Sequence, residues 1–370
     1  MTERLHEDIA ALAALVRDSA GAGERESSRW IAERLRELEV EDVAIEPYRG
    51  PRTYAWAHLV HALAGLAAAV RGSRALALAA LASYELEVSG RLPWVRRLLP
   101  SGQGDNVVAL LPAAGRPRRT LVLVAHHDAA RTGLMWHPRL VNAGASRRNR
   151  RQASPPAAAP LALAALGVAS GTRAGRRIGG AVHALAAALL LDVARSPTVP
   201  GANDNASGVA GVLELVRRFV ARPLDGVEVV VALTGGEESG MGGMAAFLDE
   251  HPLDPQTAFV LGLDTIGSGR PIVAVGEGTL LTHRYREADV AFVERAARAA
   301  GLEPPERWRL GAWTDPVLAT YRGLPTVSIL SVDEQGGYGR YHVPQDTPEH
   351  VDHACVARCV DLAEAVARAL

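Results

Sequence analysis

The sequence predicts an α/β fold in which a mostly parallel mixed sheet carries helices on both faces. Short runs rich in β-branched apolar residues end in polar or glycine-rich turns, which is typical of strands buried on both faces. Segments with helical periodicity lie between these runs, and strands that alternate with helices predict a largely parallel sheet. Hydrophobic residues make up 48% of the chain and charged residues 22%, which is typical of a folded protein.

The predicted elements cover most of the chain. In chain order, the expected strands are DVAIEPY at 42–48, NVVALLP at 106–112, TLVLVAHHD at 120–128, VEVVVALTG at 227–235, TAFVLGLD at 257–264 and TVSILS at 326–331. The expected helices span about 2–19, 24–38, 207–221, 243–250, 287–300, 314–322 and 350–369. Together they describe one sheet between two layers of helices.

Two regions, 54–99 and 137–196, depart from this alternation. Each contains Ala-rich apolar runs joined by a basic link, RGSR in the first and GTRAGRR in the second, which predicts a helical hairpin. The longest apolar run, at 54–70, has 17 residues, fewer than the roughly 20 that a membrane-spanning helix needs. We leave open whether the hairpins pack as soluble helices, or contact a second subunit or a membrane surface through 54–85 and 155–195. Arginines beside the second hairpin suit anionic lipid headgroups, although a solvated loop is the simpler interpretation.

Composition excludes several classes of function. The formal net charge of −1 provides no overall field that would attract nucleic acid. All 40 basic residues are arginine, so chemistries that need a lysine, such as Schiff-base formation or a P-loop, are excluded. The two cysteines, Cys355 and Cys359, supply neither a disulfide framework nor a Cys-rich metal site.

The N-terminal segment indicates a cytoplasmic protein. Glu3, Glu7 and Asp8 lie where a secretory signal would carry basic residues and an apolar run. We therefore expect an amphipathic helix here and no signal peptide.

A His-x-Asp pair, His126 and Asp128, follows directly from one of the predicted strands. An imidazole at a strand end can bind a metal while a nearby carboxylate holds its other ring nitrogen and fixes the tautomer. On its own the pair is weak evidence, because a histidine at a strand end more often contacts only water. Whether this pair belongs to a metal site therefore depends on the presence of other ligands.

Two adjacent carboxylates, Glu237 and Glu238, follow the strand VEVVVALTGG. Like charges side by side are unfavourable unless a cation or a proton neutralises one of them. A metal ion would do so, with one carboxylate as a ligand and the other free to act as general base toward a metal-bound water. Two exposed turn glutamates are the common alternative, which fits poorly after a buried strand and within a glycine-rich turn.

Three further residues extend this candidate site. Asp264 ends a predicted strand, His342 lies in the loop RYHVPQDT, and Asp204 lies in PGANDNASG at the start of a predicted helix. Singly, each has an ordinary explanation as a turn, cap or surface residue. His126, Glu238 and Asp264, however, share the C-terminal edge of the predicted sheet, where open α/β proteins bind ligands.

Two imidazoles and three carboxylates suit two divalent ions, zinc before all others. One carboxylate must then be shared by both ions. Asp204, held between neighbouring turns, is the expected bridge.

The order of these motifs resembles the di-zinc aminopeptidase family, which includes bacterial leucine aminopeptidases, glutamate carboxypeptidases and glutaminyl cyclases. The matching motifs are HxD at 126–128, DNASG at 204–208, GEE at 236–238, LD at 263–264, and YH at 341–342 with the later Asp346. The resemblance covers about 1–53, 101–136 and 197–370.

This resemblance implies two Zn²⁺ ions, with other divalent ions such as cobalt or manganese as alternatives. It assigns the ligands in two sets, His126, Asp204 and Asp264 for one ion, and Asp204, Glu238 and His342 for the other. It also implies that Glu237 is the general base and that Asp128 orients His126.

The chain departs from the family pattern at two places. Asp128 and Asp204 are 76 positions apart, where the family usually has a short loop. We therefore expect a single di-zinc peptidase domain, 1–370, into which the hairpins at 54–99 and 137–196 are inserted. The usual Ser-Asp-His is here Thr314-Asp315-Pro316, so a substrate contact at that position lacks its usual residues.

The expected function is that of a metal-dependent exopeptidase, an aminopeptidase that hydrolyses N-terminal peptide bonds with a zinc-bound water and Glu237 as base. Glutaminyl cyclisation and carboxypeptidase-type activity are alternatives for the same site. A third alternative is a non-enzymatic, membrane-associated protein that keeps the fold. The presence of all five ligands and of the base favours an enzyme.

Overall fold

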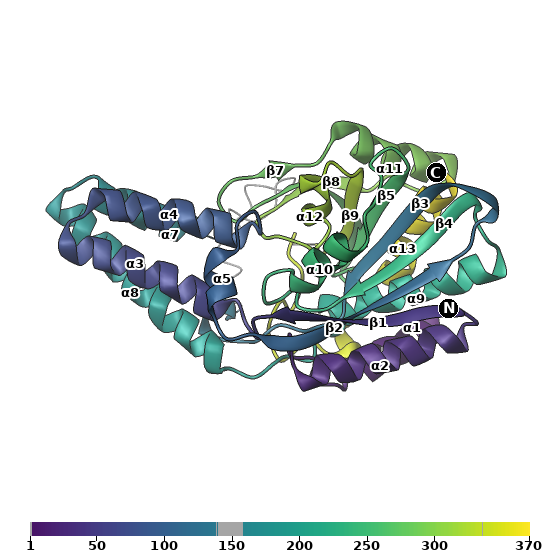
Figure 1. The fold of residues 1–370 in the computed structure, drawn as a ribbon, viewed down its shortest axis with the longest axis horizontal. Helices are drawn as coiled ribbons and strands as arrows, with labels where there is room; N and C mark the ends of the chain where they lie inside the picture. The colour runs from purple at the N-terminus through teal and green to yellow at the C-terminus, as the bar shows by residue number, and fades with distance from the viewer. Residues whose placement is uncertain (1, 138, 140–157, 335) are drawn as a thin grey trace.

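A single mixed sheet forms the centre of the molecule (Figure 1). The computed structural model describes residues 2–137, 139, 158–334 and 336–370. Within these residues the strands are β1 (Asp42–Gly50), β2 (Gly102–Leu111), β3 (Ala114–His126), β4 (Asp225–Thr234), β5 (Ala258–Leu263), β6 (Arg270–Glu277), β7 (His283–Arg284), β8 (Glu306–Leu310) and β9 (Thr326–Val332).

The four central strands are parallel. The sheet order is β1-β2-β4-β3-β5-β9-β6-β7, and β8 pairs with β6. Strands β4, β3, β5 and β9 pair in parallel, whereas β1, β2, β6 and β7 add antiparallel pairs at the two sides. The predicted mixed α/β sheet is thus confirmed, with antiparallel pairing outside its centre. The parallel centre matters for the site, because it brings several carboxyl ends of strands to one edge.

Helices cover both faces of the sheet. They are α1 (Thr2–Ala13), α2 (Ala22–Glu37), α9 (Ser207–Ala221), α10 (Gly242–Glu250), α11 (Glu287–Ala299), α12 (Val317–Tyr321) and α13 (His353–Arg368). The short helix α5 (Trp94–Leu98) instead packs against two helices outside this body. Along β3, Leu121 and Leu123 enter the larger core with α1, α2, α9, α11 and α13, while Val122 and Val124 enter the smaller core with α10 and α12. Successive side chains of a strand point to opposite faces, so an uninterrupted apolar run serves both cores.

The sequence did not predict β6, β7, β8 and α5. Strand β6 (RPIVAVGE) contains Pro271 and Gly276, which weaken the strand pattern. Strand β8 (ERWRL) contains three charged residues, and β7 has two residues only. These strands lie at one side of the sheet, where pairing with neighbours rather than a buried apolar pattern determines their structure.

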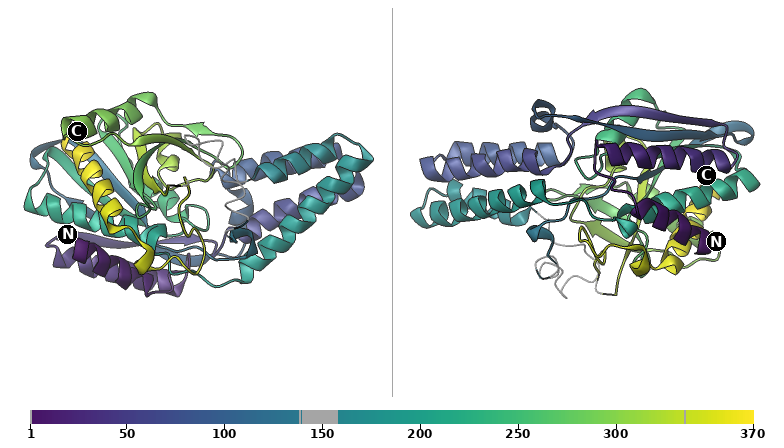
Figure 2. Two further views of the ribbon diagram at one scale, coloured as in Figure 1. Left: turned by 180° about the vertical axis from the view of Figure 1, so that it is seen from behind. Right: turned by 90° about the horizontal axis from the view of Figure 1, so that it is seen from below.

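Four helices extend away from this body as an arm (Figures 1 and 2). The helical arm consists of α3 (Ala55–Arg71), α4 (Arg74–Val88), α7 (Ala159–Ala169) and α8 (Arg173–Arg195). Helix α3 packs against α4 and α8, and α7 packs against α4 and α8. Small residues permit this close packing: a Cβ added at Gly180 would lie 3.2 Å from the Cβ of Ala69.

The helices of the arm fall within the two segments predicted as hairpins. Part of the second segment, residues 138 and 140–157, lies outside the described residues. That both hairpins are insertions into one peptidase domain stays a prediction.

Candidate metal centre

The candidate ligands gather at the carboxyl edge of the parallel strands. His126 is the last residue of β3, Asp264 directly follows β5, and Glu238 lies shortly after β4. Asp204 belongs to the short turn η2 (Ala202–Ala206) that leads into α9. His342 lies in the loop after β9, at a positive φ of 56°. The structure therefore brings together all five residues that the sequence nominated.

Asp204 lies between the two histidines. Its Oδ1 is 3.3 Å from Nε2 of His126, and its Oδ2 is 3.2 Å from Nε2 of His342. Asp264 lies on the His126 side, with Oδ2 3.9 Å from that Nε2, and Glu238 lies on the His342 side, with Oε2 3.2 Å from that Nε2. The five side chains thus form two groups that share one carboxylate.

The donor atoms fit divalent metal ions. Glu238 Oε1 and Nδ1 of His342 are buried without a hydrogen-bond partner in the described part of the chain, and the 3.2 Å approach of His342 Nε2 to Asp204 Oδ2 lacks hydrogen-bond geometry. Such orphaned polar atoms require an explanation, of which a bound ion is one. A cavity of about 20 Å³ lies among His126, Asp204, Glu238 and Asp264, large enough for one water-sized species. Imidazole and carboxylate donors at such a site match the preference of zinc.

The pKa shifts of the clustered residues also favour bound cations. Burial alone would lower the pKa of His342, but Glu238 and Asp204 beside it raise that pKa to about 10. Burial raises the pKa of Asp264 to about 7, although His126 acts in the opposite direction. Burial also raises the pKa of Glu237 well above its ordinary value. The cluster therefore has more carboxylates than two imidazoles can balance, and cations would relieve this.

Asp128 holds the turn that carries the paired glutamates. Its carboxylate accepts hydrogen bonds from the backbone N–H groups of Glu237 and Glu238, at 3.1 and 3.2 Å, and from Oγ of Ser19 at 2.6 Å. Its Oδ1 lies 3.4 Å from Nδ1 of His126, and its backbone oxygen lies 3.2 Å from the same nitrogen. Asp128 is thus positioned to fix both the imidazole and the glutamate turn.

Asp346 holds the Asp204 turn. Its two carboxylate oxygens accept the N–H groups of Asn203 at 2.8 Å and of Asp204 at 3.1 Å. Burial raises the pKa of Asp346 to about 6, and these backbone donors act in the opposite direction. The last aspartate of the sequence pattern therefore contacts the backbone of Asp204, the central candidate ligand.

Sequence reasoning missed Arg17, whose guanidinium is fully buried. Its Nε donates to the carbonyl of His127 at 2.8 Å, and its terminal nitrogens donate to the carbonyls of Pro200 at 3.0 Å and Gly201 at 2.8 Å, and to that of Leu12. Arg17 thus joins the loops on either side of the site. No local signal in the sequence marks it, because its partners are distant in the chain.

The position with Thr314-Asp315-Pro316 is built into the interior. Asp315 is buried and accepts a hydrogen bond from the hydroxyl of Thr234 at the end of β4. Burial raises the pKa of Asp315 to about 7. Thr314 lines the small cavity and donates to Glu277 from its N–H at 2.7 Å and its hydroxyl at 2.8 Å. Thr314 and Asp315 are thus held by hydrogen bonds to Glu277 and Thr234 next to the site.

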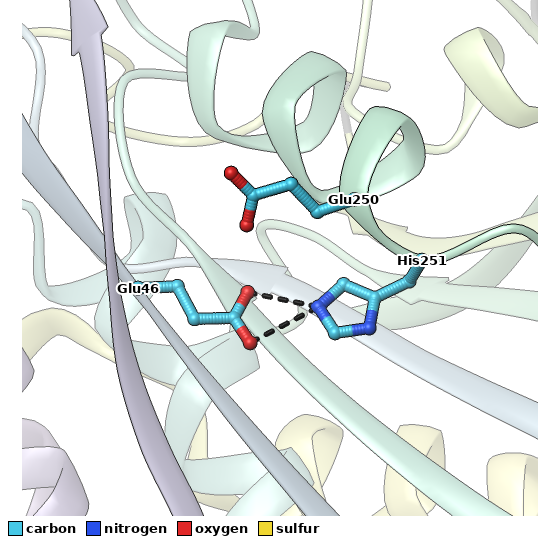
Figure 3. Close-up of side chains that lie close together, drawn as sticks. All are labelled: Glu46, Glu250 and His251. Atoms are coloured by element: carbon cyan, nitrogen blue, oxygen red, sulfur yellow. Dashed lines mark hydrogen bonds and ion pairs between the residues drawn. The ribbon is translucent and has the colours of Figure 1, made fainter.

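A second group of metal-ligand types lies elsewhere, on β1 and at the end of α10. Glu46, Glu250 and His251 approach one another there, and Nε2 of His251 lies 2.9 and 3.0 Å from the two oxygens of Glu46 (Figure 3). Glu250 is exposed, and none of the three lines the cavities at the strand edge. We interpret the His251–Glu46 contact as a hydrogen bond that links the end of α10 to β1.

The α/β fold thus carries a cluster of histidine and carboxylate side chains that could hold a metal ion. The model for Peptidase family M28 matches residues 186–367. This match includes Glu237 and the predicted ligands Asp204, Glu238, Asp264 and His342, while His126 and Asp128 precede it. The resemblance to di-zinc aminopeptidases is therefore confirmed, as a similarity to Peptidase family M28 over 182 of the 370 residues.

Known proteins resemble parts or all of the chain. Over 158 residues it is 38% identical to a vacuolar membrane protease of Schizophyllum commune, a match that covers 42% of this chain and 17% of that protein. A zinc aminopeptidase from Bacillus subtilis has 15% identity and a TM-score of 0.58, covering 99% of this chain and 94% of its own. A glutaminyl cyclase from Bacteroides thetaiotaomicron has 13% identity and a TM-score of 0.60, covering 100% and 97%. At these identities the solved structures show a shared fold.

Proposed function

We propose that the protein is an aminopeptidase that hydrolyses the peptide bond next to a free amino terminus. The observation that carries the proposal is the position of Asp204 between two groups of ligands at the carboxyl edge of the sheet. The M28 match supports peptide hydrolysis, and the zinc aminopeptidase fold supports action at the amino terminus.

Two zinc ions are part of this proposal. His126 and Asp264 would hold one ion, Glu238 and His342 the other, and Asp204 both. We expect about two zinc ions per chain in the wild type, about one in His342→Ala and fewer still in Asp204→Ala, because only Asp204 contacts both groups. Elemental analysis after dialysis measures this, and full zinc content in both variants would refute the assignment.

Bound zinc would supply Lewis acidity, which polarises the scissile carbonyl and lowers the pKa of water. The residues of the chain perform the proton transfers. Glu237 lines both the small ligand cavity and the larger cavity beside it, so its carboxylate can take a proton from the attacking water and deliver it to the leaving amine. Asp128 keeps His126 and the glutamate turn in position while this happens.

The test is a panel of free-amino aminoacyl nitroanilides, N-blocked counterparts and N-terminal glutaminyl peptides, incubated with the zinc-loaded protein. Cleavage restricted to unblocked substrates would establish the aminopeptidase. Release of ammonia from glutaminyl peptides without nitroaniline release would instead establish the cyclase. Cleavage of N-blocked peptides from their carboxyl end would replace the proposal with carboxypeptidase activity.

We also propose that the helical arm contacts a membrane surface. The stretches 54–84 and 158–191 contain no Asp or Glu, and five arginines lie around the two turns at the end of the arm, namely Arg71, Arg74, Arg173, Arg176 and Arg177. Those turns adjoin, because Arg176 donates to the carbonyls of Ala69 at 3.0 Å and Val70 at 2.9 Å. A cationic end without carboxylates complements anionic headgroups.

Exposed apolar side chains accompany these arginines. Large hydrophobic residues are exposed on all four helices, including Val70 (73%), Leu78 (48%), Leu163 (70%) and Ile178 (66%). By length and composition α8 is long and apolar enough to cross a membrane. Of its most apolar stretch, 33% is buried within the protein. The name of the S. commune relative supports a membrane location, whereas a cytoplasmic location and the absence of a signal peptide stay predictions.

A further inference from the structure

A second, larger cavity lies between the helical arm and the strand edge. Its volume is about 310 Å³, at the lower end of the range for small-ligand pockets. Glu237, Glu238 and His342 form part of its wall, so it opens directly on the proposed catalytic centre. A group placed in this cavity would lie next to the bond that is cleaved.

Aromatic and aliphatic side chains form most of the remaining wall. The arm contributes Tyr84 from α4 and Ala186, Leu189 and Leu190 from α8. The body contributes aromatic residues that include Trp136 and Trp313. The arm and the body therefore share in building an apolar pocket.

The charged groups of the wall, outside the catalytic cluster, are already satisfied or neutral. Arg96 donates from Nε to Glu87 at 2.7 Å, and its other nitrogens donate to the carbonyls of Gly240 and Glu87. Burial lowers the pKa of His58 to about 3, which keeps this imidazole neutral at physiological pH. Neither group offers a free charge to an ionised substrate side chain, which would lose its hydration without compensation.

We propose that this cavity is the specificity pocket of the enzyme and that helix α8 of the arm sets its preference for a large apolar side chain beside the scissile bond. The proposal rests on the proposed peptidase function for the identity of the ligand. Transfer of an apolar side chain from water into such a pocket is favourable in proportion to the area buried, so substrates with Leu, Phe or Trp should exceed those with Gly, Ala, Glu or Arg.

Two alanines of α8 provide a matched pair of variants. Ala186 lines the cavity, whereas Ala188, two positions further along the same helix, is exposed. We expect Ala186→Phe to fill part of the pocket and to weaken binding of a Phe-Leu dipeptide about tenfold or more, with less than about a twofold effect on Ala-Ala. Ala188→Phe adds the same side chain outside the pocket and should change neither affinity.

Binding is measured by calorimetry in the Glu237→Gln background, so that the readout does not depend on turnover. Cleavage of the corresponding nitroanilides is measured in parallel with Glu237 intact. If the wild type cleaves peptides but Ala186→Phe leaves the preference for Phe over Ala unchanged, the pocket proposal is overturned and the proposed function stands. If no peptide is cleaved but Ala186→Phe still abolishes binding of Phe-Leu, the pocket stands and the proposed function fails.

A second variant covers the case in which Ala186→Phe unfolds the arm. Leu189→Ala removes a partly buried side chain from the same wall and leaves the helix intact. We expect it to weaken Phe-Leu binding about fivefold, through lost apolar contact, with thermal unfolding of the protein as a check on the fold. Equal affinities of wild type and Leu189→Ala for Phe-Leu would also overturn the proposal.

Discussion

Glu237 is the residue on which the proposed chemistry depends most directly. It lines both the small cavity among the ligands and the larger apolar cavity, and burial raises its pKa well above the ordinary value. Because no ligand role is assigned to it, Glu237→Gln should keep zinc at the wild-type level while kcat falls about a thousandfold. Elemental analysis and nitroanilide hydrolysis on one sample measure both quantities. The exposed Glu250→Gln is the control, and a Glu237→Gln enzyme with near-normal kcat would remove Glu237 from the mechanism.

Glu277 provides a test of buried charge beneath the site. It is fully buried at the end of β6 and accepts hydrogen bonds from Tyr285 Oη at 2.6 Å and from Thr314. Burial raises its pKa to about 7 in the folded protein, whereas in an unfolded chain it should titrate near its ordinary value. At pH values between the pKa of Glu277 in the unfolded chain and its pKa in the folded protein, Glu277 is protonated in the folded state and ionised in the unfolded state. The stability contributed by Glu277 is therefore complete below about pH 4.5 and is lost as the pH rises through 7.

The corresponding measurement is the free energy of unfolding of wild type and Glu277→Gln in denaturant, at equal zinc content, from pH 4.5 to 7.5. The wild type should lose roughly 3 kcal/mol relative to the variant across this window. A difference that stays constant with pH would show that Glu277 titrates alike in both states.

Individual site residues could be predicted where their signal is local. The proposed ligands His126, Glu238 and Asp264 lie at or shortly after the ends of buried strands, so strand prediction places them at one edge. The contacts of Arg17 and Asp315 could not be predicted in this way. Their partners lie far away in sequence, and a buried arginine or aspartate carries no periodic or motif signal.

At the scale of elements, the end of α1 shows how tertiary contacts override periodicity. The apolar pattern predicted a helix to about residue 19, but α1 ends at Ala13. The backbone then runs beside the segment that follows β3, since the carbonyl of Arg17 accepts the N–H of Ala129 at 2.8 Å and Asp18 bridges to Ala129. Burial lowers the pKa of Arg17 to about 10, while Asp346 and Asp128 act in the opposite direction, so it remains charged at neutral pH. A helix continued to residue 19 would not present this guanidinium to the loops of the site.

We therefore expect Arg17→Met to lower the free energy of unfolding by about 3 to 5 kcal/mol, since it leaves several buried carbonyls without a donor. Zinc affinity should fall as well, because the turn before Asp204 loses its anchor at Pro200 and Gly201. Denaturant unfolding and zinc titration measure the two effects, with the exposed Arg29→Met as control. Unchanged stability in Arg17→Met would contradict this account.

At the scale of the whole molecule, the central part of the sheet could be predicted from the sequence. The parallel strands β3, β4, β5 and β9 are apolar on both faces, so their sequences carry the pattern strongly. Strands β6 to β8 could not be predicted, because their structure depends on pairing with neighbouring strands. The mutual packing of the two hairpins could not be predicted either, because it depends on contacts between segments far apart in the sequence. The hairpins pack against each other as one arm through small residues that also suit many other interfaces.

The surface of that arm leads to a prediction about the whole molecule. Its turns carry arginines and no carboxylates, so we expect the protein to sediment with vesicles that contain phosphatidylserine and much less with pure phosphatidylcholine. Replacing Arg71, Arg74, Arg173 and Arg177 with Gln should weaken this binding roughly a hundred- to a thousandfold, at about 1 kcal/mol per arginine. Arg176 is kept because it caps the end of α3.

The control carries the same change in charge on the body of the protein, with Gln at the exposed positions Arg116, Arg119, Arg295 and Arg298. If the arm binds the membrane, the control should sediment like the wild type, and raising the salt concentration should weaken both alike. Apolar contact is tested separately with Ile178→Ser and Leu185→Ser, which remove exposed hydrophobic surface from α8 without changing its charge. Failure to bind either vesicle, together with a concentration-dependent dimer in light scattering that these serine variants abolish, would assign the arm to a subunit interface instead.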